Sequence, residues 1–94
     1  MKKKVKVEVL ATREQIGEIN EGAMFADGYD DCLIGYVERF GAPPLALYDR
    51  EKVIHKLMKR DGMDYDTAQE FFDFNIIGAW VGENTPAFAT ILTK

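Results

Sequence analysis

The sequence predicts one small α+β domain in which a mostly antiparallel sheet packs against two main helices. Apolar, β-branched and aromatic residues on either side of a proline-containing turn, at 32–39 and 45–48, predict a hairpin. Apolar residues at three- and four-residue spacing predict two successive helices that begin near Arg50 and Tyr65. A length of 94 residues, 47% hydrophobic and 30% charged, indicates a single globular domain over 1–94.

The first part of the chain predicts a strand and then a short helix. The strand is predicted because three valines alternate with charged residues: Val5, Val7 and Val9. Lysine-rich residues 1–4 precede it as a candidate flexible arm. Thr12 and Gln15 have the spacing of a capping box, which predicts a helix over 13–20, and residues 23–31 then form a loop.

Capping residues define the two main helices. Asp49 occupies the N-cap position of a helix over 50–60, which Gly62 ends. Asp64 begins the next helix, whose core-facing stripe runs toward Trp80, with Gly82 as the expected end.

Two further segments complete the predicted fold. Residues 87–92 are β-rich enough to form a closing strand. In residues 31–40 a helix is the alternative to a strand, because Gly35 is the only strong helix opponent there.

The predicted last helix becomes apolar on two sides in its second half. Opposite the core-facing stripe it carries Phe74, Ile77 and Val81, with Gly78 and Gly82 as small residues that permit close approach of a neighbouring backbone. One interpretation is that this half is enclosed within the monomer. The other is an exposed interface for a partner or a second copy, formed by Phe74, Ile77, Gly78 and Val81.

A small polar pocket is the candidate site for a ligand or a reaction. Its candidate members are Tyr48, Asn75, Trp80, Glu83 and Thr85. Asn75 is expected to be buried and to bond a loop or strand backbone, because an unpaired buried amide costs about 1–3 kcal/mol. The spacing of these residues identifies no ligand, and we expect no cofactor.

Nucleophilic catalysis has few candidate residues in this chain. Cys32 and His55 are its only thiol and imidazole, so a Cys–His pair would need both. The pattern instead favours Cys32 as a small packed residue and His55 as a flank or surface residue. Serine is absent from the sequence, which excludes a serine nucleophile. A non-enzymatic protein is therefore the favoured hypothesis.

The charge distribution argues against direct nucleic-acid binding. The formal net charge is −4, but four of the twelve bases lie within residues 1–6, which leaves eight bases against sixteen acids from residue 7 onward, a balance of −8. Such a body repels phosphate backbones. The candidate acidic surface comprises Glu18, Glu21, Asp27, Asp30 and Asp31. It is either a set of solvated turns, a nucleic-acid mimic or a cation site, although its spacing fits no EF-hand loop and we expect no metal.

The same patterns predict a location in a reducing cytoplasm. No apolar run approaches the roughly 20 residues that span a bilayer. The charged start is not followed by the apolar stretch of a secretory signal, and a single cysteine forms no internal disulfide.

Two segments resemble a family of small uncharacterised proteins encoded by tailed bacteriophages and prophages. They are Tyr-Asp-Arg-Glu-Lys-Val-Ile at 48–54 and the stretch 63–86, of which Phe-Asn-Ile-Ile-Gly-Ala-Trp-Val-Gly-Glu-Asn-Thr-Pro at 74–86 is the specific part. With residues 31–41 the resemblance covers over half of the chain. It implies a viral accessory protein that works in the bacterial host cytoplasm. By analogy with small phage proteins, we expect it to bind a host or defence protein, with a homodimer as a further expectation.

Overall fold

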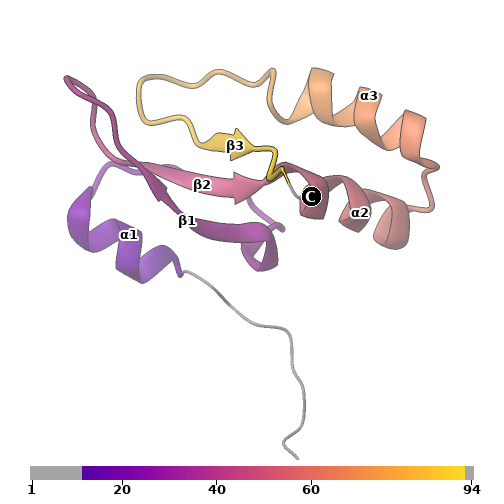
Figure 1. The fold of residues 1–94 in the computed structure, drawn as a ribbon, viewed down its shortest axis with the longest axis horizontal. Helices are drawn as coiled ribbons and strands as arrows, with labels where there is room; N and C mark the ends of the chain where they lie inside the picture. Colours follow the sequence, from indigo (N-terminus) through magenta and orange to yellow (C-terminus); the bar gives the residue numbers. More distant parts are fainter. Residues whose placement is uncertain (1–11, 93–94) are drawn as a thin grey trace, which may run out of the picture.

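The computed structural model describes residues 12–92, which form a small α+β domain (Figure 1). Its elements in chain order are α1 (Arg13–Ile19), the 3-10 helix η1 (Asp30–Cys32), β1 (Leu33–Val37), β2 (Leu45–Asp49), α2 (Arg50–Asp61), α3 (Tyr65–Asn75) and β3 (Ala87–Ala89). The predicted fold class is therefore confirmed. The expected strand at Val5, Val7 and Val9 and the arm at 1–4 lie outside the described residues.

The sheet has the order β1-β2-β3. β1 and β2 pair antiparallel, from Leu33 opposite Tyr48 to Val37 opposite Leu45, with an irregularity between Leu33 and Gly35. This confirms the predicted hairpin, and the alternative of a helix over 31–40 is wrong. β3 is shorter than the expected strand over 87–92 and pairs parallel to β2, because α2 and α3 lie between the two strands and carry the chain back (Figure 1).

The helix starts follow from local capping. Thr12 forms the predicted capping box with Gln15, and Asp49 accepts hydrogen bonds from two backbone N–H groups of the first turn of α2. Gly62 ends α2 with φ +72°, a left-handed conformation that favours glycine. Asp64 caps α3 by accepting from the Thr67 N–H at 2.8 Å.

α3 is shorter than the sequence predicts. We expected it to run toward Trp80 and to end near Gly82, but it ends at Asn75. The backbone N–H groups of Ile76 and Ile77 both donate to the carbonyl oxygen of Phe72, at 3.0 and 2.9 Å, and this shared acceptor ends the regular hydrogen-bond pattern of the helix. Residues 76–86 consequently leave the helix and return as an irregular segment to β3.

Gly78 makes this return possible. A Cβ atom at this position would lie 2.7 Å from the carbonyl oxygen of Asp73 and 3.2 Å from that of Phe74. Any side chain would therefore collide with the end of α3. The space left by the absent side chain of Gly78 is therefore filled by the backbone of α3. The sequence pattern had instead predicted that a partner's backbone approaches at this position.

An aromatic trio joins the sheet to α3. Tyr48 of β2 stacks on Phe88 of β3 at 5.4 Å between ring centroids, and Phe72 of α3 meets Phe88 edge to face at 5.1 Å. Tyr48 and Phe72 are fully buried. The remainder of the described core consists of Ile16, Tyr29, Cys32, Leu33, Ala46, Val53, Ile54, Leu57 and Ala68. Because Phe72 of α3 is buried in this core, the core holds in place the end of α3 from which the next segment departs.

Candidate functional site

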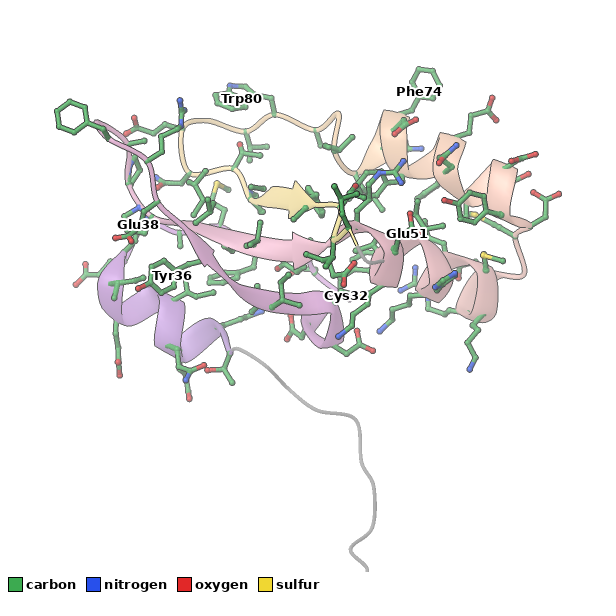
Figure 2. The ribbon with its side chains drawn as sticks, in the orientation of Figure 1. Cys32, Tyr36, Glu38, Glu51, Phe74 and Trp80 are labelled. Atoms are coloured by element: carbon green, nitrogen blue, oxygen red, sulfur yellow. The ribbon has the colours of Figure 1, made fainter. Side chains whose placement is uncertain are left out.

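The most unusual surface of the described residues lies at the end of α3 and in the segment after it. Four large apolar side chains are exposed there: Phe74 (78%), Ile77 (47%), Trp80 (74%) and Val81 (56%). We call these four residues the apolar ridge. Phe74 and Trp80 point outward along the same edge of the molecule (Figure 2). The interpretation that this region is enclosed within the monomer is wrong, because the helix ends before Ile77 and leaves the ridge open to solvent.

The part of the chain that carries the ridge is acidic in sequence. Residues 64–85 contain no lysine or arginine. Their carboxylates are all exposed: Asp64, Asp66, Glu70, Asp73 and Glu83. Among the described residues, Arg50 forms the one ion pair with these carboxylates: its guanidinium lies 3.8 Å from Asp73 and also bonds Glu51. The surface thus combines exposed aromatic groups with mostly unneutralised negative charge.

The predicted polar pocket does not assemble. Tyr48 is buried in the core, and its hydroxyl accepts a hydrogen bond from the Ala26 N–H at 2.8 Å. Burial also raises the pKa of Tyr48, so the hydroxyl stays neutral. Trp80 and Glu83 are exposed. Thr85 uses its hydroxyl to close a turn, since it donates to the Gly82 carbonyl and accepts from the Val81 N–H.

Asn75 also differs from the expectation. Its amide is exposed and donates within its own helix, to the Phe71 carbonyl at 3.3 Å, so the expected buried bond to a loop or strand is wrong. Asn75 lines two hollows. One, of about 320 Å³, includes Thr85, Val81 and apolar residues of the 24–29 loop and β3, and the other lies beside Phe74. Two members of the predicted pocket therefore share a hollow, but its lining is mainly apolar.

Cys32 and His55 line one hollow of about 460 Å³ beside α2, but the thiol is not activated. Cys32 is 2% exposed and donates to the Asp31 carboxylate at 3.6 Å. Burial and the Asp31 charge raise the pKa of Cys32 from 9.0 to about 12, which keeps it a neutral thiol at pH 7. The geometry gives no support to a Cys–His nucleophilic pair.

The candidate acidic surface is partly neutralised. Arg13 donates to both Asp27, at 3.1 Å, and Asp30, at 2.9 Å. Lys56 lies 2.9 Å from Asp31 and lowers the pKa of that carboxyl. The remaining members, Glu18 and Glu21, are exposed on α1 and just after it. The five carboxylates therefore do not form a uniform array of free negative charges. Among the described residues, no group of three or more His, Cys, Asp or Glu side chains is placed to hold a metal ion.

Two features of these surfaces differ from the sequence-predicted sites. Trp80 was predicted in the polar pocket but belongs to the apolar ridge, and its place next to the predicted interface residues was the available signal. The hollow beside α2 is lined mainly by basic residues, whose helical spacing at 52, 56 and 59 is visible in the sequence.

Comparison of the chain with known proteins finds no matching family model, curated protein or solved structure. Within residues 12–92, no helix is long and apolar enough to cross a membrane.

Proposed function

We propose that this chain is a non-enzymatic binding protein whose apolar ridge contacts a partner protein. The observation that carries the proposal is the exposure of Phe74 and Trp80 on one edge (Figure 2). Exposed aromatic residues are costly in water and are the residues that most often dominate binding energy at protein interfaces. The lack of an activated nucleophile or an assembled polar pocket among the described residues agrees with a binding role.

The charges near the ridge favour a foreign partner over a second copy. A symmetric dimer through the ridge would place the same patch of both copies, with carboxylates such as Glu70 and Asp73, in one interface. Like charges at an interface oppose association. A partner with an apolar pocket and lysine or arginine at its rim would instead complement both the ridge and the nearby carboxylates.

The resemblance of residues 74–86 to phage and prophage proteins supports a host or defence protein as the partner, in the cytoplasm of an infected bacterium. The ridge lies within this segment. We do not favour a nucleic-acid mimic, because Asp27, Asp30 and Asp31 are paired with Arg13 and Lys56.

Comparative affinity capture from bacterial lysate tests the proposal. The baits are the unchanged chain, Phe74→Ser, Trp80→Ser and the control Phe40→Ser, which removes a fully exposed aromatic side chain from the turn between β1 and β2. We expect one protein to be retained by the unchanged chain and the control but lost by both ridge variants. Retention that does not depend on the ridge would contradict the proposal. A dimer in sedimentation analysis that Phe74→Ser dissociates would identify a second copy as the occupant.

A further inference from the structure

The hollow beside α2 concentrates positive charge on an acidic protein. Residues 12–92 contain seven lysine and arginine residues, of which three lie elsewhere: Arg13, Arg39 and Arg50. The other four line this one hollow together with His55: Lys52, Lys56, Lys59 and Arg60. Cys32, labelled in Figure 2, marks the place where η1 and the start of β1 meet this side of α2.

Two of the four cations are held in place by neighbouring groups. Lys56 is paired with Asp31, the only carboxylate of the lining. Arg60 donates to Asp61 and to the Tyr29 hydroxyl, both at 3.0 Å, and its guanidinium lies 5.1 Å from the centre of the Tyr29 ring. Such contacts reduce the conformational entropy that a ligand would have to remove.

The other two cations have no ion-pair partner among the described residues. Lys59 is in the last turn of α2, where the helix dipole favours a positive charge. Lys52 is in the first turn, where the dipole disfavours it, and it lies one helical turn from Lys56, a like charge that destabilises the helix further. Both electrostatic effects oppose a lysine at 52, and an anion bound in the hollow would offset them.

We propose that this hollow binds a polyphosphate group. Lysine binds phosphate as a compact point charge, and several lysines along one helix face suit a ligand with several charges in a row. Lys52 and Lys59 are seven residues apart, about 10 Å along the helix axis. A single phosphate is too small to contact both lysines at this separation. A short chain of phosphates can contact both, because the lysine side chains are long and flexible. The lining contains no Phe, Tyr or Trp, and His55 is its one aromatic ring, so its cations favour recognition of the phosphates over that of a base.

Titration of the isotope-labelled full chain with inorganic triphosphate, followed by NMR at low ionic strength, tests this site. We expect saturable shifts in residues 52–60. Lys52→Gln and Lys59→Gln should each weaken binding about fivefold or more. Arg39→Gln, which removes an exposed base from the turn between β1 and β2, should leave the affinity unchanged. Matched thermal melts of the variants show that each is folded.

Four results would overturn the polyphosphate site. The first is a lack of saturable shifts with triphosphate. The second is an equal loss of affinity in Arg39→Gln. The third is the same shifts with sulfate at matched ionic strength, which would show charge screening alone. The fourth is saturation by a glutamate-rich peptide but not by triphosphate, which would make the hollow a protein-docking surface. None of these results depends on the apolar ridge.

Discussion

Asn20 and Asn84 are joined by a hydrogen bond of 2.9 Å across 64 residues of sequence, with the Asn20 amide as the donor. The same amide donates to the Pro44 carbonyl at 2.8 Å, and the Asn20 oxygen accepts from the Gly22 N–H at 3.0 Å. One side chain thus fastens the end of α1 to the hairpin and to the segment that follows the apolar ridge. The ridge is held by α3 at one end and by Asn84 near the other.

Asn20→Ala is expected to destabilise the fold by about 1–3 kcal/mol, because it leaves partly buried partners without a hydrogen bond. Urea unfolding measures this change. Asn75→Ala is the matched control, since its exposed amide makes one bond within its own helix, and we expect a change within about 0.5 kcal/mol. Equal effects of the two substitutions would show that the hydrogen bonds of Asn20 add no more to the free energy of unfolding than the exposed bond of Asn75.

Tyr48→Phe is expected to cost about 1–2 kcal/mol of unfolding free energy, because the Ala26 N–H loses its acceptor on the sheet. The ring stays in place, so the stacking on Phe88 is retained. Tyr36→Phe removes a hydroxyl from a side chain that is 48% exposed and should have almost no effect. A Tyr48 variant as stable as the control would contradict the described role of this bond.

Cys32 is expected to resist alkylation in the folded protein and to react fully in urea. Its thiol is buried, and its pKa is raised to about 12 from 9.0. Because the folded pKa is the higher one, stability is unaffected below pH 9 and falls as pH rises from about 9 to 12, where the unfolded thiol ionises first. Iodoacetamide labelling at pH 8 measures the reactivity, and rapid labelling without denaturant would contradict it.

Asp64→Ala is expected to lower the melting temperature at pH 7 but to have little effect near pH 2. The Thr67 backbone N–H lowers the pKa of Asp64, so its contribution is present above the ordinary pKa and is lost as pH falls through the lower, folded value. Glu70→Ala, in the middle of α3, is the control and should show no comparable loss at pH 7. A difference between Asp64→Ala and the parent that is the same at both pH values would contradict the titration account.

Local signals predicted the beginnings of the helices well. A capping side chain acts within three residues, so Thr12, Asp49 and Asp64 could be identified from spacing alone. The hairpin was equally local, because its two strands flank a short turn.

Long-range contacts limited the rest of the prediction. α3 stops at Asn75 because the chain folds back on itself at Gly78, and the apolar pattern does not reveal that close approach. The prediction of Tyr48 in a polar pocket was wrong, because its hydroxyl instead accepts from the Ala26 N–H, 22 residues away in a loop, and a local pattern does not reveal that contact. The sequence shows the apolar residues at 74–81 but leaves open whether they are enclosed or exposed, and only the fold shows that they are exposed.

The affinity between this chain and the protein that it captures tests the central claim most directly. With purified components, we expect Phe74→Ser to weaken binding at least about 30-fold, the loss typical of a central aromatic residue at an interface. Phe40→Ser should change the affinity less than about twofold. Equal affinities for Phe74→Ser and the unchanged chain would contradict the proposal that the apolar ridge is the binding surface.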